Sequence, residues 1–594
     1  MLGKSESEKL MKKGINILNT KLGSNILTHI LLYKNLTTHR RIIKADETGE
    51  LLSNYENPYQ GMKALLQSYP ELMDRVAVVQ DRTITYKELW TEIEAFANYL
   101  HAHVDYQKGE IFSVCAASSI EGIVSFFALN RLGIISGRVF NGSQVDKMKY
   151  NINNFSSKVV LADNGNLEVL LKSIKNTKVK TVILMSGCEE INKNIIEKEY
   201  PAVQFITYRE ILEKGKEYND SFEEKVFAKD MASVLYTSGS SGEPKPISIP
   251  NRTYMNMMEV VCNTTNVVKC DGERVIGVVS QEYPYANINC TVMVLMMGKT
   301  LIMPAHKEDK SIDFGKLMEE KPNRIQAIPN FYKLWMETGQ NNTLQRKRYN
   351  FLNSVISGGE QYLKNEKIEL LRFLSEHDCR PLLIDGFGFG ELGSATALKF
   401  GLCDYFLLMN GMEAKAIHPE TMEKLPLDEE GILCFTGPTI TDGYYNNTEQ
   451  TQKCFVQDET GKKWFISDTY GSVHGRKRRL IKLGGRVREY FITDDGAGNF
   501  VKVYAGTVED VIMSCNFIRD CIVVPSDTGA TPRPVAYIAI SENMGANEQK
   551  IIESVEDKCK SLEKFAQPIQ YEIEEGIVRT KAGKKDYEYY RMKR

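Results

Sequence analysis

The chain has 594 residues, of which 42% are hydrophobic and 26% are charged, and its formal net charge is −2. This length exceeds what one hydrophobic core supports, so we expect at least two domains. The balanced charge leaves no basic surface of the kind that nucleic-acid-binding proteins carry. No apolar run approaches the ~20 residues that span a bilayer, so the sequence predicts neither a nucleic-acid partner nor a membrane.

The 12 cysteines are scattered, with no CxxC pair and no Cys/His cluster at zinc spacing. This pattern is typical of buried thiols in a reducing compartment. The first residues, MLGKSESEKLMKK, lack the long apolar core of a signal peptide. We therefore expect a cytoplasmic protein.

Three zones follow one another along the chain. Residues 1–58 are rich in Lys, Asn and Thr, and we expect a helical extension without chemistry. Residues 59–476 alternate helical patterns, such as 87–101 and 120–131, with strand-like runs, namely KVVLAD, TVILMS, ASVLYT and RVIGVVS. That alternation predicts a large doubly wound parallel α/β domain. Residues 477–594 have a short α+β pattern with CIVVPS and VAYIAI as strands, which predicts a small second domain.

A Gly- and Ser-rich loop follows the apolar run MASVL. Tyr236–Lys245 reads YTSGSSGEPK, and its glycines let the backbone turn N–H groups inward. Inward N–H groups, hydroxyls and a lysine suit a polyphosphate. The loop is not a Walker A loop, which needs GxxxxGK followed by Ser or Thr, and a plain Ser/Gly turn is the alternative. The residues predicted to bind phosphate are Thr237, Ser238, Gly239, Ser240, Ser241, Gly242 and Lys245.

Two more glycine motifs follow strand-like runs. In ISGGEQ, Ile356–Gln361, two glycines let the backbone approach a flat ligand closely. In LLIDGFGFGE, Leu382–Glu391, we expect the strand to end at Asp385, before Phe387 and Glu391. An aromatic ring can stack on a purine, and a carboxylate beside a triphosphate is a hard oxygen ligand for Mg²⁺. Taken alone, either motif could be a tight turn.

These motifs, in this order, resemble those of the adenylate-forming superfamily, which includes acyl-CoA synthetases, aryl-acid ligases, luciferases and peptide-synthetase adenylation domains. The resemblance covers about residues 60–594 and extends to WFISDTYG, GRKRR, IKLGG and VRTKAGKKDY; the segment GPTITDGYYN matches a structural motif without catalytic residues. This chain departs from the family pattern at Pro246, Gly390 and Arg478, and in a short hairpin after WFISDTYG. The resemblance implies an enzyme that uses ATP and Mg²⁺ to convert a carboxylic acid to an acyl-adenylate, and a small domain that moves before the acyl group passes to a thiol.

The resemblance also implies residue roles. Lys584 would bridge the acid carboxylate and the α-phosphate. The alternative is an ordinary solvent-exposed lysine. Glu391 would hold Mg²⁺, and Asp468 would bind the ribose hydroxyls with Arg476 beside it. The predicted catalytic residues are thus Lys584, Glu391 and Thr237. Further nucleotide contacts are expected from Gly358, Gly359, Glu360, Asp385, Gly386, Phe387 and Gly388.

The acid pocket is expected along QEYPYANINC, Gln281–Cys290. Relatives that activate α-amino acids carry an Asp there, and its absence argues against such a substrate. Tyr283, Tyr285, Phe331 and Tyr332 could form a slot for an aryl or short acyl acid, and an aromatic core is an equally compatible reading. The residues predicted to line the pocket are Tyr283, Tyr285, Ser357 and Gly388.

The acceptor thiol is expected to belong to CoA or to a separate phosphopantetheinyl carrier protein, because ten residues follow Lys584. The basic GRKRR and the insertion Tyr490–Lys502 favour a carrier protein slightly, since complementary charge speeds association. Two alternatives stay open: a stand-alone amino-acid-activating adenylation enzyme, and a nucleotide-binding protein with impaired turnover, which the departures from the family pattern would explain.

Overall fold

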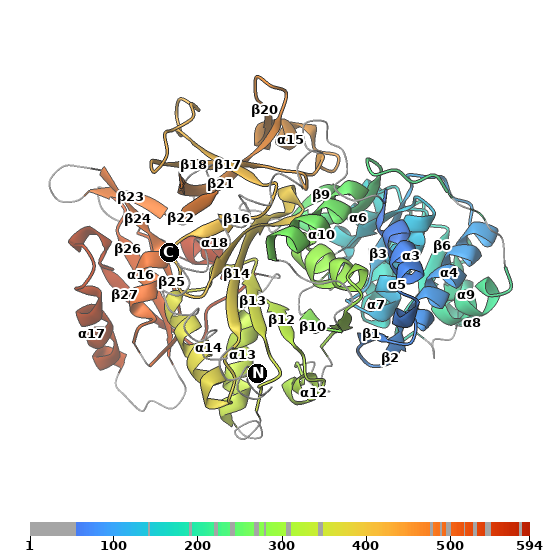
Figure 1. The fold of residues 1–594 in the computed structure, drawn as a ribbon, viewed down its shortest axis with the longest axis horizontal. Coiled ribbons are helices and arrows are strands. Elements are labelled where there is room, and N and C mark those ends of the chain that lie inside the picture. The colour runs from blue at the N-terminus through green and yellow to red at the C-terminus, as the bar shows by residue number, and fades with distance from the viewer. Residues whose placement is uncertain are drawn as a thin grey trace, which may run out of the picture.

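The computed structural model describes residues 55–593 apart from sixteen short gaps. The gaps are 140–142, 189–192, 219–221, 223, 238–243, 266–271, 278–280, 305–310, 342–347, 476–478, 487–489, 495–499, 516, 527–530, 541–547 and 581–584 within that range. Figure 1 shows two sheets with helices packed against them and a smaller unit formed by the C-terminal residues. Among the residues described, no helix combines the length and the apolar character needed to cross a membrane.

An eight-stranded sheet lies in the N-terminal half, in the order β19-β9-β8-β4-β3-β5-β6-β7. The strands from β8 to β7 in this order are parallel, while β9 and β19 are antiparallel. The parallel part is the doubly wound architecture that the sequence predicts. The strands are β3 (Ile111–Cys115), β4 (Ile135–Arg138), β5 (Val159–Ala162), β6 (Thr181–Leu184), β7 (Gln204–Thr207), β8 (Met231–Thr237), β9 (Lys245–Pro250) and β19 (Gly443–Tyr444).

Helices cover this sheet, and their ends follow local capping chemistry. Helix α4 begins after Thr85, whose side chain and that of Glu88 form a capping box. Helix α5 begins after Ser119, which accepts a hydrogen bond from the Gly122 N–H group. The helices are α3 (Pro58–Ser68), α4 (Tyr86–His103), α5 (Ile120–Arg131), α6 (Val145–Asn154), α7 (Asn164–Ser173), α8 (Lys193–Glu199) and α9 (Tyr208–Gly215). The helices expected at 87–101 and 120–131 are confirmed.

A fourteen-stranded sheet forms the centre of the molecule, in the order β17-β18-β21-β22-β16-β15-β14-β13-β12-β10-β11-β1-β2, with β20 paired to β21. It is parallel from β14 to β1 in this order and antiparallel beyond. The strands are β1 (Val76–Val79), β2 (Thr83–Thr85), β10 (Arg274–Gly277), β11 (Thr300–Ile302), β12 (Arg324–Ala327), β13 (Ser354–Gly358), β14 (Leu382–Phe389), β15 (Ser394–Phe400), β16 (Phe406–Leu408), β17 (Glu413–Ile417), β18 (Glu430–Thr436), β20 (Phe455–Gln457), β21 (Lys463–His474) and β22 (Leu480–Arg486).

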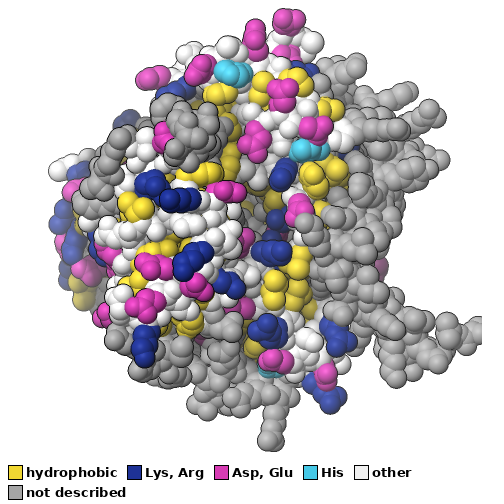
Figure 2. All heavy atoms as spheres, turned by 90° about the vertical axis from the view of Figure 1, so that its left-hand side faces the viewer, with side chains coloured by type: hydrophobic (Ala, Val, Ile, Leu, Met, Phe, Trp, Pro, Cys, Tyr) yellow, Lys and Arg dark blue, Asp and Glu magenta, His cyan; other side chains and the backbone are white. Residues whose placement is uncertain are grey.

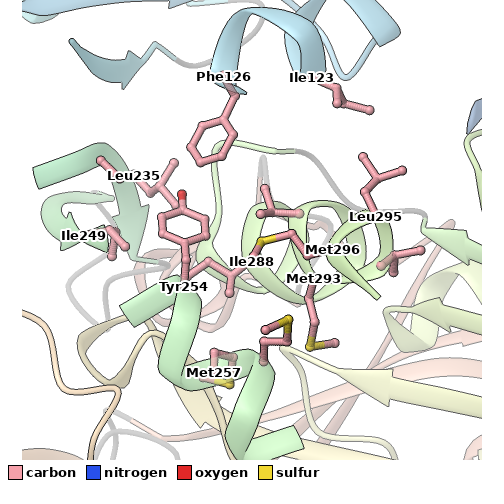
Figure 3. Close-up of a cluster of buried hydrophobic side chains, with 14 of the residues drawn as sticks. Ile123, Phe126, Leu235, Ile249, Tyr254, Met257, Ile288, Met293, Leu295 and Met296 are labelled. Atoms are coloured by element: carbon pink, nitrogen blue, oxygen red, sulfur yellow. The ribbon is translucent and has the colours of Figure 1, made fainter. Parts of the chain in front are cut away.

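The two sheets share a buried apolar core. Figure 3 shows part of it, where side chains from α5, β8 and α10 (Asn251–Thr265) meet those of the π-helix η2 (Tyr285–Val292) and α11 (Met293–Met296). Methionines fill much of this contact, as suits an irregular junction. Helices α12 (Phe314–Glu319), α13 (Pro329–Asn341) and α14 (Lys364–Glu376) cover the central sheet near its parallel strands.

The C-terminal unit contains a three-stranded sheet of β25 (Ile518–Pro525), β26 (Pro534–Ile540) and β27 (Gln570–Glu574). Helices α16 (Ala505–Ile512), α17 (Glu548–Cys559) and α18 (Tyr587–Met592) accompany it. The insertion expected at 490–502 contains the antiparallel hairpin of β23 (Tyr490–Asp494) and β24 (Phe500–Tyr504).

Two local features differ from the sequence-based expectations. Strand β14 does not end at Asp385 but continues to Phe389, because it pairs with β15 across a register shift at Gly388. A Cβ at Gly388 would lie 1.7 Å from the Ser394 carbonyl oxygen, so only glycine fits this close approach. Strand β22, which follows the expected domain boundary at residue 476, is hydrogen-bonded within the central sheet to β16 and β21.

Candidate active site

Thr237 ends strand β8, where the predicted phosphate loop begins. Its hydroxyl is buried without a hydrogen-bond partner among the described residues. A Cβ on Gly390 would lie 2.7 Å from the Thr237 Cγ2 atom and 3.3 Å from Pro284. The close approach gives a physical reason for Gly390, since a threonine there would force Thr237 or Pro284 to move. The loop residues Ser238, Gly239, Ser240, Ser241 and Gly242 lie outside the described residues, so their predicted role stays a prediction.

Glu391, the predicted magnesium ligand, lies in the short helix η3 (Gly390–Leu392) and is buried. Its Oε1 atom accepts a 2.5 Å hydrogen bond from the Tyr444 hydroxyl. Its backbone carbonyl accepts bonds of 3.0 Å from the N–H and hydroxyl groups of Thr441. Burial raises the pKa of the Glu391 carboxyl; the nearby charge of Asp468 acts in the same direction, while Tyr444 and Lys245 act to lower it.

Tyr444 is a site residue that the sequence analysis missed. It lies in GPTITDGYYN, to which no chemistry was assigned, and on β19 beside β9. Burial and the Glu391 carboxylate raise the pKa of the Tyr444 hydroxyl, which therefore stays protonated and donates. The Lys245 Nζ atom lies 5.7 Å from the centre of the Tyr444 ring. No local spacing signals this contact, because it joins segments far apart in the sequence.

Asp468 is half-buried on β21, and its charge acts on Glu391. The structure therefore brings the predicted ribose, magnesium and phosphate residues Asp468, Glu391 and Lys245 into one neighbourhood. Arg476, the expected second ribose contact, lies outside the described residues.

The glycines of the ISGGEQ motif lie at the end of β13. A Cβ on Gly358 would lie 3.2 Å from the Tyr285 ring, so the Tyr285 ring packs directly on this glycine. The Ser357 hydroxyl is buried without a hydrogen-bond partner among the described residues. Gly359 has a φ of 81°, which favours glycine. Two predicted pocket residues, Tyr285 and Ser357, thus lie beside Gly358, for which a nucleotide contact is predicted.

The remaining β14 residues divide into two environments. Phe387 is half-buried, and its ring lies 5.1 Å from Phe389 and 5.7 Å from Phe406. Asp385 is buried, and its carboxylate pairs with Lys367 and, at 3.4 Å, with Lys399. Asp385 is thereby held by α14 and β15, so its predicted contact with nucleotide stays a prediction. Gly386 pairs with Gly358 across the sheet, and Gly388 is exposed.

Two of the four aromatic residues considered for the acid slot belong to the core. Tyr332 is fully buried, donates a 2.7 Å hydrogen bond to the Ile356 carbonyl and stacks on Tyr362. Phe331 packs against Phe314. Tyr283 and Tyr285 remain at the site, since both rings are half-buried in the segment that contains Pro284.

Glu360 follows the end of β13, and its side chain contacts the C-terminal unit. Its Oε1 atom accepts a 3.0 Å hydrogen bond from the Lys585 backbone N–H group and lies 3.5 Å from Arg579. Lys585 is the chain neighbour of the predicted catalytic Lys584, which lies outside the described residues. The position of Glu360 therefore links the ISGGEQ motif to the segment that carries Lys584.

More ion pairs surround this contact. Asp520 pairs with Arg579 at 2.7 Å and with Lys333 of α13 at 3.0 Å. The Lys585 ammonium lies 2.9 Å from Glu509. Burial acts to raise the pKa of Asp520, but Lys585, Lys333 and Arg579 hold it well below its ordinary value. We call the following residues the interface cluster: Lys333, Glu360, Glu509, Asp520, Arg579 and Lys585.

Comparison with known proteins places the chain in a family. The profile of the AMP-binding enzyme family matches residues 67–445. The probable CoA ligase CCL5 of Humulus lupulus is 24% identical over 501 residues, which cover 80% of this chain and 82% of that protein. A long-chain-fatty-acid–CoA ligase of Salmonella typhimurium is 20% identical over 553 residues, which cover 87% and 93%.

Several solved structures share the fold of this chain. The anthranilate CoA ligase AuaEII in complex with anthranoyl-AMP aligns with a TM-score of 0.75 at 15% identity, over 91% of this chain and 97% of that one. A benzoate CoA ligase from Burkholderia xenovorans aligns with a TM-score of 0.73 at 16% identity, over 90% and 99%. The α/β fold and the acid–thiol ligase activity expected from the sequence are confirmed, and the chain belongs to the AMP-binding enzyme family.

Proposed function

We propose that the chain activates an aryl or short acyl acid with ATP and transfers the acyl group to CoA, using Thr237, Glu391, Asp468 and Lys584 in the roles that the sequence predicts. One observation carries the proposal: the acid segment reaches the start of the phosphate loop. Pro284 and Thr237 both approach Gly390, which directly precedes Glu391. A carboxylate held by this segment would lie beside a bound triphosphate.

The chemistry follows from this proximity. A carboxylate oxygen attacks the α-phosphorus of ATP, a new P–O bond forms, and the bond to pyrophosphate breaks. Charge crowds around the reacting phosphorus, so positioning and electrostatic stabilisation supply most of the rate enhancement. In the second step the thiolate attacks the acyl carbon and AMP leaves.

The donor set around Glu391 fits a magnesium ion. Mg²⁺ is usually bound by one or two carboxylates together with substrate phosphates. Glu391 offers one buried carboxylate, and the Tyr444 hydrogen bond would orient it, as an outer-shell partner orients a ligand. When bound, Mg²⁺ would neutralise charge on the phosphates.

The interface cluster includes residues on both sides of the segment that carries Lys584. Lys585 and Arg579 flank the 581–584 segment in sequence, and both contact Glu360 at the end of β13. We infer that these contacts set the orientation of the C-terminal unit in which Lys584 reaches the reacting carboxylate. Release of the same contacts would let that unit move for thioester formation.

CoA is the acceptor that we propose. The relatives described above are named CoA ligases, and the slight preference of the sequence analysis for a carrier protein has no further support. Figure 2 shows acidic and basic side chains interspersed on the face of the C-terminal unit, where an acidic carrier would favour a continuous basic surface. Cytoplasmic location stays a prediction from the cysteine pattern.

Exchange of labelled pyrophosphate into ATP, measured over a panel of carboxylic acids, tests the proposal. Acid-dependent exchange with at least one aryl or short acyl acid, followed by thioester formation with CoA, is expected. Exchange supported only by α-amino acids would overturn the substrate assignment. Absence of exchange with every acid would favour the nucleotide-binding alternative.

The role of the hairpin β23–β24 in choosing the acceptor should be tested by a partial replacement, not by deleting the whole insertion. Phe491 belongs to the buried core of the C-terminal unit, so removing residues 490–502 would also remove core packing. Replacing only residues 495–499 with a two-residue turn avoids this. We expect CoA thioester formation to survive that replacement; loss with CoA would show that the tip contributes to the CoA site.

A further inference from the structure

A fully buried arginine lies one strand away from Thr237 and has no role in the site described so far. Arg138 is the last residue of β4, and its side chain is 1% exposed. Its Nη2 atom donates a 2.8 Å hydrogen bond to the Gln281 Oε1 atom. Its Nε and Nη1 atoms are buried without a hydrogen-bond partner among the residues that the structure describes.

The Arg138 side chain lies on the sheet face that also carries Thr237. Strand β4 runs parallel to β8 with Gly137 opposite Val234, so Arg138 is level with Leu235. Side chains alternate along a strand, which places those of Arg138, Leu235 and Thr237 on one face. Strand spacing and rise separate the Cα atoms of Arg138 and Thr237 by roughly 8 Å, within reach of an extended arginine side chain.

The surroundings of that face are visible in Figure 3. Leu235 and Tyr254 lie in the same cluster, and the Tyr254 hydroxyl points toward Phe126 and Leu235. That hydroxyl is held by a 2.6 Å hydrogen bond to Asn287 of η2. Tyr254 therefore has its partner, whereas the Nε and Nη1 nitrogens of Arg138 have none within the described parts of the chain.

The single partner of Arg138 belongs to the acid segment. Gln281 begins that segment, and its Nε2 atom reaches the Thr291 hydroxyl of η2 at 3.4 Å. The next residue, Glu282, accepts a 2.8 Å backbone hydrogen bond from Tyr236 of β8. The segment then continues through Pro284, which approaches Gly390. Arg138 thus lies beneath the stretch of chain that carries the predicted acid pocket.

A buried cation with idle donors is costly unless a ligand satisfies it. Burial lowers the pKa of Arg138, and the charge of Glu282 acts to raise it. Arg138 nevertheless forms no ion pair with any residue in the described ranges. Nε and Nη1 lie on opposite edges of the guanidinium plane, and Nη2 has a second N–H group besides the one that it donates to Gln281. One edge, formed by Nη2 together with Nε or Nη1, can therefore bind the two oxygens of a carboxylate.

We propose that Arg138 binds the second carboxylate of a dicarboxylic acid substrate, which is an inference that rests on the proposed function. The same N–H groups could instead donate hydrogen bonds to a nucleotide phosphate. A carboxylate is favoured because Arg138 hydrogen-bonds into the acid segment, whereas the residues assigned to nucleotide gather around Glu391. A monocarboxylic acid would bring no second carboxylate to Arg138, so the pocket would favour dicarboxylic over monocarboxylic acids.

The test compares acids that differ only in the second carboxylate. Pyrophosphate exchange is measured for butanoate against succinate, pentanoate against glutarate, and benzoate against the three benzenedicarboxylates. The wild-type protein should prefer one dicarboxylate by at least about tenfold in kcat/KM. Arg138→Met keeps the length of the side chain without charge or donors, and it should remove that preference. Arg138→Lys keeps the charge but loses the two-pronged geometry, so this variant should retain part of the preference for the dicarboxylate.

Two further measurements separate the outcomes. The calorimetric affinity for ATP should be the same in wild type and Arg138→Met; weaker ATP binding with an unchanged acid preference would assign the guanidinium to a phosphate and overturn the proposal. The preferred dicarboxylate alone should raise the melting temperature of wild type but not of Arg138→Met. That shift is independent of turnover, so it separates this inference from failure of the ligase activity.

A matched control exists in the same domain. Arg131 is also buried, but it donates hydrogen bonds to Asn98 at 2.9 Å and to the Phe222 carbonyl at 3.2 Å. Arg131→Met should lower the melting temperature without changing the acid preference. A wild-type preference for monocarboxylates, or an Arg138→Met variant that keeps the dicarboxylate preference, would refute the assignment.

Discussion

The acid segment and the interface cluster hold buried polar groups in opposite ways. Near the acid segment, the hydroxyls of Thr237 and Ser357 and two nitrogens of Arg138 have no hydrogen-bond partner among the described residues. In the interface cluster, Asp520 and Lys585 are held by opposite charges within 3 Å. The unpaired atoms beside the acid segment are available to a ligand, whereas the charges of Asp520 and Lys585 form a contact that the protein completes by itself.

The difference predicts which region contributes to stability and which contributes to catalysis. Substitutions in the interface cluster should lower stability and alter the orientation of the C-terminal unit. Substitutions around Glu391 should lower the rate of adenylation at little cost to stability. The predictions below test that division, from the largest expected effect to the smallest.

Asp520→Asn should cause the largest loss of stability. It leaves the half-buried Lys333 and Arg579 beside a neutral group, and removing the buried partner of such ion pairs costs about 3–5 kcal/mol. Chemical denaturation monitors the loss. Asp557→Asn is the matched control, since Asp557 pairs with Lys560 at an exposed position on α17 and should change stability by less than about 0.5 kcal/mol. Equal effects of the two variants would refute a structural role for the cluster.

Glu391→Gln should abolish most adenylation. Its carboxylate is the hard-oxygen donor next to the phosphate loop, and we expect pyrophosphate exchange to fall by about 10²–10³-fold, as for the loss of a key electrostatic contact. The melting temperature should stay near that of wild type, because the neutral amide avoids the cost of burying a charged carboxylate. Exchange within a factor of two of wild type would remove Glu391 from the magnesium role.

Tyr444→Phe should produce a smaller loss of the same kind. The substitution removes the hydroxyl that donates to Glu391 but keeps the ring. Loss of an outer-shell partner typically lowers metal affinity or activity by about 10–100-fold. The loss should appear as a higher Mg²⁺ requirement in the exchange assay. The neighbouring Tyr445→Phe serves as control, and a similar loss in both variants would point to general packing instead.

Glu366→Gln should change the pH dependence of stability. Burial raises the pKa of Glu366 to about 7, Asp520 acts in the same direction, and Lys585 and Lys333 act against it. The folded state therefore holds a proton that the unfolded state has released between about pH 4.5 and 7, so the contribution of Glu366 to stability falls as pH rises through that window. Gln carries no titrating proton, so the variant should lose this fall. An unchanged pH profile would show that Glu366 does not titrate there.

Local elements were predictable from the sequence because their signals are local. Apolar spacing and a serine cap predict the helix at 120–131. An apolar run that ends at a polar loop predicts the strand ASVLYT. The neighbourhood of Glu391 and Asp468 was predictable through the family motifs. All of these signals lie within a few residues of the element that they describe.

Contacts between distant segments were not predictable in this way. The bond from Tyr444 to Glu391 joins residues 53 positions apart, and the one from Lys585 to Glu360 spans 225. Strand β14 extends beyond Asp385 because β15 is there to pair with it. Each depends on which strand lies beside which, and no residue pattern in a single segment encodes that.

The proposed function depends most on one step, the formation of an acyl-adenylate by the protein before any thiol takes part. Single-turnover reactions with α-labelled ATP, Mg²⁺ and an acid active in exchange test it directly. Without CoA, up to one acyl-AMP per protein molecule should accumulate, and adding CoA should convert it to free AMP and an acyl-CoA thioester. Release of ADP with an acyl-phosphate, or AMP formation that requires CoA from the outset, would contradict the claim.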